Sequence, residues 1–346
     1  MIQSETYIAI PPGETIKEQL DDRGMLQKEF ALRMGMSEKH ISHLINGDVQ
    51  LTIPVAIKLE SVLGLPTKFW IALETRYREK IEKANAENDL LEDEKILKNF
   101  PYAKMVTLGW IENAQTKTDK IILLRKFFEV SKLSLLADSK LSNLACRRLK
   151  ITEKSDNILL VFAQKAKLEA RFVETKSINL QKLQKHLQVI RRMTLEPLDT
   201  FQKELQNFFC ECGIALIFLP HITSSYLQGI SFFSGKKIVI GITNRGQYSD
   251  KFWFTLFHEL AHIVLGHLDL ENGTTDKEEK CADNWAKDNL ISPKSFNNFV
   301  RDKNFSKESI LQFANSENIS PSIIVGRMQK EGYLKFNQFN DLRIKF

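Results

Sequence analysis

The sequence predicts a multidomain protein with an all-α N-terminal domain, a helical connector and an α+β C-terminal domain. Between residues 14 and 80, short segments of helical pattern are separated by glycine and proline. Residues 82–195 keep a helical pattern with very little glycine or proline. After Pro197, short apolar runs typical of buried strands alternate with apolar helical segments. We therefore expect domains at 1–80, 81–195 and 196–346.

The composition fits a folded protein in a reducing compartment. At 346 residues, 43% hydrophobic and 27% charged, the chain can bury two or three cores. No apolar run approaches the roughly 18–20 residues of a membrane span, and the first residues lack a signal-peptide pattern. The four cysteines form no disulfide framework for a chain this long. We expect a cytoplasmic protein without a membrane partner, whose net charge of +6 is compatible with a nucleic-acid partner.

A helix, a tight turn and a second helix are predicted between Leu26 and Gly47. Gly35 supplies the turn, Ser37 is a natural N-cap for the second helix, and Asn46-Gly47 ends it. The helical spacing leaves polar residues on the outer face of the second helix: Glu38, Lys39, Ser42 and His43. Such a face suits a reader of the DNA major groove. The alternative is an ordinary helical hairpin with a polar surface.

This segment resembles the helix-turn-helix of the Xre family, in its HigA-like branch. The resemblance rests on Gln27, Ala31, Gly35, Ser37, Ile41-Ser42, Asn46-Gly47, Ala56, Leu59-Glu60 and Leu63-Gly64. It implies base contacts by Glu38, Lys39 and His43. It implies phosphate contacts by Gln27, Ser42 and Asn46, which with Ser37 complete the predicted DNA-binding set of a dimer on a two-fold operator. Glu38 and His43 depart from the commoner Gln or Arg, so no base sequence is predicted.

Two histidines and a glutamate stand in an apolar helical segment from Ser249 to Gly266, where Ser249 is expected to cap the helix. His258 and His262 are four residues apart, which places both imidazoles on one helical face, about 5–6 Å apart at Cβ. One tetrahedral zinc ion can bind both. Glu259 lies beside the open position, where it can take a proton from bound water and pass it to a leaving amine. We expect a Zn²⁺ cofactor and Glu259 as the catalytic carboxylate.

A third zinc ligand is expected downstream, where two carboxylates share one helical face. Glu279 would complete the zinc site, and Asp283 would accept the second N–H of a ligating histidine. Cys281 is an alternative ligand. However, it lies two residues after Glu279, so its side chain is expected to point in another direction. A metzincin site needs a histidine where Leu268 stands. The other alternative is that the two histidines are core residues of a buried helix.

These residues resemble the ImmA/IrrE metallopeptidase family over roughly residues 195–335. The shared segments are Phe252-Trp253-Phe254-Thr255, Leu265-Gly266-His267, Glu279, Ala282-Asp283, Trp285-Ala286, Leu290-Ile291-Ser292-Pro293 and Ser322 to Met328. The resemblance implies a zincin-like fold, zinc held by His258, His262 and Glu279, and cleavage of a DNA-bound repressor. Cys281 and Trp285 depart from the family pattern and leave the ligand set intact. Four residues are candidates for stabilising the oxyanion: Tyr226, His221, His267 and Arg245.

Together these patterns predict a DNA-binding transcriptional regulator with a zinc-dependent metallopeptidase domain. We expect it to cleave a partner repressor or regulator at a toxin–antitoxin, prophage or stress locus. The expected partners are operator DNA, a protein substrate or a cognate toxin, and a second copy of the chain. The alternative is a non-proteolytic, antitoxin-like DNA-binding repressor whose zincin-like domain is a sensor or protein-interaction module.

Overall fold

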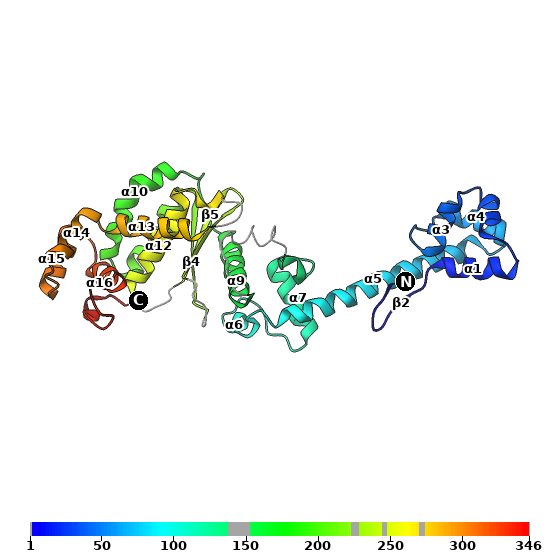
Figure 1. Ribbon diagram of the computed structural model, residues 1–346, viewed down its shortest axis with the longest axis horizontal. Coiled ribbons are helices and arrows are strands. Elements are labelled where there is room, and N and C mark those ends of the chain that lie inside the picture. The colour runs from blue at the N-terminus through cyan, green and yellow to red at the C-terminus, as the bar shows by residue number, and fades with distance from the viewer. Residues whose placement is uncertain (1, 138–152, 223–227, 244–247, 270–273, 346) are drawn as a thin grey trace. The chain divides into compact units, whose positions relative to one another are not determined.

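A computed structural model describes residues 2–137, 153–222, 228–243, 248–269 and 274–345. The chain divides into two compact units, Met1–Lys95 and Ile96–Phe346, each of which is described by itself (Figure 1). No helix within these ranges is long and apolar enough to cross a membrane. The three-part division into residues 1–80, 81–195 and 196–346 stays a prediction.

The first unit consists of helices preceded by a small antiparallel hairpin. Its elements are β1 (Ile2–Gln3), β2 (Ile8–Ala9), α1 (Pro12–Asp22), α2 (Gln27–Met34), α3 (Glu38–Asn46), α4 (Ile53–Leu63) and α5 (Thr67–Leu97), which continues past the end of the unit. The predicted helix, turn and helix between Leu26 and Gly47 are confirmed as α2 and α3. The charged run from Glu82 onward is the second half of α5.

Local signals fix both ends of α3. The Ser37 hydroxyl accepts a hydrogen bond of 3.2 Å from the backbone N–H of His40. Gly35 and Gly47 take left-handed φ values of 62° and 77°, which glycine adopts without strain. The inward faces of α1 to α5 bury one apolar core, which includes Ile16, Phe30, Ile41, Leu44, Leu59 and Trp70. This core orients α3, so the helix has one fixed outer face.

The second unit combines a three-stranded sheet with helices. Its helices are α6 (Tyr102–Thr107), α7 (Lys117–Phe128), α9 (Glu153–Ala170), α10 (Leu180–Arg192), α11 (Leu198–Glu211), α12 (Ser249–Val264), α13 (Asp276–Leu290), α14 (Pro293–Arg301), α15 (Lys307–Glu317) and α16 (Pro321–Lys330). The 3₁₀ segments are Leu133–Ala137, Met193–Leu195, His267–Asp269 and Asn340–Leu342. Its strands are β3 (Ile214–Leu219), β4 (Gly229–Ser234) and β5 (Lys237–Thr243). Short buried strands after Pro197, as predicted, are confirmed, and a two-residue turn at Gly235-Lys236 joins β4 to β5.

The sheet has the strand order β3-β5-β4 and is covered on both faces. β3 runs parallel to β5, with Ile214 opposite Ile238, and β4 runs antiparallel to β5. Because side chains alternate along a strand, Leu216 packs in the core with α11 and α12, whereas Ile217 packs in the core with α9. The sheet therefore lies between α9 and the α11–α12 layer. This double covering explains why all three strands are strongly apolar.

The N-terminus of α12 is held by the C-terminal segment of the chain. Its N-cap is Tyr248, without a side-chain hydrogen bond, so the expectation that Ser249 caps the helix is wrong. Ser249 is already helical, and its buried hydroxyl lies 3.2 Å from that of Ser322. Asp250, in the first turn, accepts hydrogen bonds of 2.9 and 2.7 Å from Arg343. The side chains of this ion pair are only 5% and 8% exposed, so it is a buried anchor for α12.

Candidate nucleic-acid interface and metal centre

Helix α3 turns a polar face away from the core of the first unit. Its buried residues are Ile41, Leu44 and Ile45. At 3.6 residues per turn, Lys39, His43 and Asn46 lie on the opposite side of the helix. Glu38 and Ser42 lie at the edge of that face, while Gln27 is the exposed first residue of α2 and Ser37 caps α3. The structure thus brings the predicted DNA-binding residues to one accessible helix, its cap and its neighbour.

One hydrogen bond on this face was not predicted from the sequence. His43 Nδ1 lies 3.0 Å from Asp48 Oδ2. The chain turns at Gly47, and the backbone N–H of Asp48 donates to the carbonyl of His43 at 2.9 Å. Such a helix end brings the residue after the glycine back over the last turn. The Gly47-Asp48 pair was the available signal for this contact.

Three predicted ligands converge in the second unit. Within the described part of the chain, His258, His262 and Glu279 form a group whose ligand atoms all lie within 4.8 Å of one another. The two histidine Nε2 atoms are 3.0 Å apart. The Glu279 oxygens lie 3.2 Å from Nε2 of His258 and 3.7 Å from that of His262. Helix α12 supplies the histidines and the neighbouring α13 supplies the glutamate.

The spacing of these atoms fits a tetrahedral zinc ion. Nitrogen and oxygen ligands bind zinc at about 2.0–2.1 Å, so two ligand atoms of a tetrahedral site lie about 3.3 Å apart. The two histidine nitrogens are 3.0 Å apart, Glu279 Oε2 lies 3.2 Å from Nε2 of His258, and the other oxygen, Oε1, lies 3.7 Å from Nε2 of His262. Each of these separations is close to that value. Two nitrogens and one carboxylate oxygen are also a donor set that zinc prefers. The residues present therefore fit the implied metal.

Hydrogen bonds from neighbouring side chains orient each of the three ligands. His258 Nδ1 lies 2.9 Å from Asp283 Oδ1, and this contact lowers the pKa of Asp283 while partial burial opposes the shift. His262 Nδ1 lies 3.0 Å from Nδ1 of His267. The Thr274 hydroxyl donates to Glu279 Oε1 at 2.6 Å. Outer partners of this kind fix the tautomer and direction of metal-binding side chains.

Glu259 lies outside this group of ligand atoms and has a separate environment. Its side chain is 1% exposed, and its Oε2 accepts a hydrogen bond of 2.7 Å from Ser231 on β4. A Cβ atom at Gly229 would lie 2.9 Å from Glu259 Oε1 and 2.7 Å from Thr255 Cγ2. Only glycine at the start of β4 leaves this space. Ser231 and Gly229 were missed because nothing local in the sequence places β4 beside α12.

The remaining candidates are not among the three converging ligands. Cys281, the alternative ligand, is exposed and is not part of the three-residue group. His267 contacts His262 rather than an open position. His221 follows β3, and the two other oxyanion candidates, Tyr226 and Arg245, lie outside the described residues.

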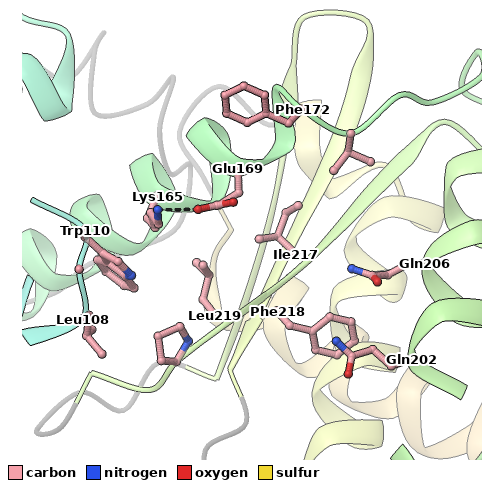
Figure 2. A pocket seen from close by; sticks show the side chains of 13 residues that line it. Leu108, Trp110, Lys165, Glu169, Phe172, Gln202, Gln206, Ile217, Phe218 and Leu219 are labelled. Atoms are coloured by element: carbon pink, nitrogen blue, oxygen red, sulfur yellow. Dashed lines mark ion pairs between the residues drawn. The ribbon is translucent and has the colours of Figure 1, made fainter. Parts of the chain in front are cut away.

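The second unit also contains a cleft of about 510 Å³ at the edge strand β3. Figure 2 shows Trp110 and Leu219 on one side of the cleft and the carboxamides of Gln202 and Gln206 on the other. Gln206 donates to the backbone carbonyl of Leu216 at 3.0 Å and thereby occupies part of the open edge of β3. None of the predicted site residues within the described ranges lines this cleft.

Comparison with known proteins places the first unit in a family. The model of a family described as Helix-turn-helix matches residues 16–70. Antitoxin HigA-1 of Vibrio cholerae serotype O1 is 44% identical over 63 residues, which cover 18% of this chain and 59% of that protein. The uncharacterized HTH-type transcriptional regulator YddM of Escherichia coli strain K12 is 35% identical over 66 residues, which cover 19% of this chain and 70% of that protein.

The matched residues are the ones that build the α1–α5 core and the outer face of α3. The chain spans less than two thirds of the length of HigA-1, and each similarity covers less than a fifth of this chain. Motif, geometry and sequence similarity agree for this unit. The chain therefore belongs to the family of DNA-binding helix-turn-helix transcriptional regulators.

Proposed function

We propose that this regulator binds one zinc ion through His258, His262 and Glu279 and uses Glu259 to hydrolyse a peptide bond of a protein substrate. The observation that carries the proposal is the convergence of His258, His262 and Glu279 from α12 and α13, whose ligand atoms all lie within 4.8 Å of one another. A zincin-like fold for the second unit is part of the same proposal. The α+β architecture, with the ligand helix packed on a covered sheet, supports it.

A role as plain core histidines accounts less well for this arrangement. A carboxylate oxygen accepts hydrogen bonds, so the contact with Asp283 places the proton of His258 on Nδ1 and leaves a lone pair on Nε2. That lone pair and the Glu279 carboxylate, 3.2 Å away, are both electron donors. A cation that lies between two such donors stabilises both of them. A divalent metal supplies that cation.

The chemistry follows from the placement of Glu259. Zinc, when bound, would polarise the substrate carbonyl and lower the pKa of a bound water to about 7. Ser231 holds Glu259 Oε2, and Gly229 leaves room beside Oε1. Glu259 can therefore take up a proton at Oε1 and return it to the leaving amine, as a general base and then a general acid.

For the first unit we propose that α3 enters the major groove of an operator, as the second helix of this motif does. A dimer on a two-fold operator places two copies of α3 one helical turn of DNA apart. We propose a repressor or regulator of the same locus as the peptidase substrate, at a toxin–antitoxin, prophage or stress locus. Joining an operator reader to a peptidase would bring the enzyme to DNA-bound substrates, which supports this choice.

The test compares three purified proteins for zinc content and for cleavage of the regulators encoded beside this gene. We expect wild type to hold one zinc ion and to cleave one of them. Glu259→Gln keeps the shape of the side chain and should keep the zinc, while cleavage falls by about 100- to 10,000-fold because the proton acceptor is gone. Gly229→Ala should also keep the zinc and lose activity, since the new methyl group crowds Glu259. Equal cleavage by Glu259→Gln would refute the catalytic role.

A second function is favoured by the similarity to Antitoxin HigA-1. In that case the chain is a non-proteolytic, antitoxin-like repressor that binds a cognate toxin, and the metal centre is a sensor or interaction site. Burial of Glu259 at 1% exposure suits such a structural metal site. Cleavage by wild type and by Glu259→Gln distinguishes the two proposals. A peptidase loses cleavage in Glu259→Gln, whereas a sensor binds zinc and DNA but cleaves no substrate in either form.

A further inference from the structure

The contact between His43 and Asp48 sets the hydrogen-bonding character of the outer face of α3. We propose that Asp48 holds the neutral His43 ring with its proton on Nδ1, so that Nε2 reads an exocyclic amino group in the major groove. His43 would thus select adenine or cytosine at one position of each half-site. The proposal rests on the proposed reading of DNA by α3.

The geometry restricts the ring of His43 in two ways. Its Nδ1 lies 3.0 Å from a carboxylate oxygen of Asp48, and a carboxylate only accepts hydrogen bonds. The backbone N–H of Asp48 donates to the His43 carbonyl at 2.9 Å, which ties the partner to the same helical turn. In a neutral imidazole one nitrogen donates and the other accepts. With Nδ1 as donor, Nε2 is left as the acceptor.

An acceptor at this place distinguishes the bases by their major-groove edges. Adenine presents an N6 amino group and cytosine an N4 amino group, both of which donate. Guanine presents the acceptors N7 and O6, and thymine presents the acceptor O4 and a methyl group. Nε2 of His43 can accept a hydrogen bond from the amino group of adenine or cytosine. With guanine or thymine it faces another acceptor, and no hydrogen bond forms. An Arg or Lys at the same place would favour guanine instead.

The orientation of α3 brings this nitrogen to the DNA side. His43 lies on the side of the helix opposite the buried Ile41, Leu44 and Ile45. Its side chain is 44% exposed even though it contacts Asp48. The ring is therefore tethered through Nδ1 while the rest of it remains accessible. Asp48 itself would be a positioning residue that touches no base.

The test is selection of bound sequences from a random duplex library at pH 8, which favours neutral imidazole. Wild type and His43→Ala are compared first, because the position whose preference disappears in His43→Ala is the one that His43 reads. We expect adenine or cytosine there in wild type, preferred by about 5- to 150-fold. Guanine or thymine at that position would overturn the proposal. If no position loses its preference, His43 reads no base and the proposal also fails.

Two substitutions of the partner then test the positioning role. Asp48→Ala frees both tautomers, so guanine should become accepted at the same position while the rest of the selected site stays unchanged. Asp48→Asn can turn either its oxygen or its NH2 group toward Nδ1, so it also permits both tautomers and should relax the preference as Asp48→Ala does. Asp22→Ala, a control that also removes one exposed negative charge of the first unit, should leave the base preference as it is. Failure to select any site at all would count against DNA reading by α3 itself, which is a separate result.

Discussion

His43 and His258 each contact an aspartate, but the surroundings of the two pairs differ. Each has its Nδ1 close to an aspartate oxygen, at 3.0 Å from Asp48 and at 2.9 Å from Asp283. Around His43 the two side chains are 44% and 56% exposed. His258 is 19% exposed and its partner Asp283 is 46% exposed, and two further electron donors lie beside Nε2 of His258. One carboxylate–imidazole pair therefore suits a ligand that arrives from solution, and the other suits a resident metal.

Burial determines how much stability is lost when a side chain loses its hydrogen-bond partner. A surface hydrogen bond exchanges with water, so its loss costs little stability. A buried polar group that loses its partner keeps its desolvation cost. We therefore expect substitutions around α12 to lower the stability of the second unit or its affinity for zinc. Substitutions on α3 should leave stability nearly unchanged and alter only DNA binding.

The largest expected effect comes from the anchor of α12. Arg343→Ala leaves Asp250 buried without its charged partner, which costs about 3–5 kcal/mol of unfolding free energy for a pair of this kind. Urea unfolding followed by tryptophan fluorescence, which reports on the first unit through the buried Trp70 and on the second through residues such as the buried Trp253, measures this cost. The matched control is Arg33→Ala, which breaks an exposed pair in the first unit and should leave stability nearly unchanged. Equal small effects of both substitutions would show that the two regions do not differ in this way.

A second prediction concerns Asp283 and compares the two aspartates directly. Asp283→Ala should lower zinc affinity or activity by about 10- to 100-fold, since the tautomer and direction of His258 are no longer fixed. Zinc affinity is measured by competition with a chelator of known affinity. Asp48→Ala is the matched control and should leave zinc binding unchanged. An Asp283→Ala protein with wild-type affinity would mean that the imidazole direction is fixed by α12 alone.

Most of the first unit could be predicted from the sequence because its signals are local. Gly35, Ser37 and Gly47 specify the turn and both ends of α3 within a few residues of the helix itself. The three zinc-ligand candidates could also be predicted from the sequence. His258 and His262 follow helical spacing, and Glu279 lies on the next helix. The contact of Asp48 depends only on the turn at Gly47 and could have been inferred from it.

The surroundings of the candidate metal centre could not be predicted in this way. Ser231 and Gly229 reach Glu259 only because β4 packs beside α12, and Arg343 reaches Asp250 from the far end of the chain. Such contacts join residues that are distant in sequence, so no spacing rule indicates them. The same holds for α9, which the sequence suggested as part of a connector and which covers one face of the sheet.

The effects expected on the DNA side are confined to DNA binding. Lys39→Ala should weaken binding to a selected operator by about 1–3 kcal/mol if it contacts a base, and should relax the preference at one position. Gln27→Ala should lower the affinity for all sequences alike, because a phosphate contact carries no sequence information. Gel-shift titrations with selected and scrambled duplexes separate the two patterns. If both variants bind both duplexes as wild type does, α2 and α3 are not the interface.

The most direct test of the account is the zinc content of wild type and two ligand variants after purification and reloading. We expect one zinc ion per wild-type chain, held by His258, His262 and Glu279. His262→Ala and Glu279→Ala each remove one of three ligands, so both should hold far less zinc and unfold more easily, because metal binding energy is partly folding energy. Wild-type protein that cannot be loaded with zinc, or variants that load as fully as wild type, would contradict the account.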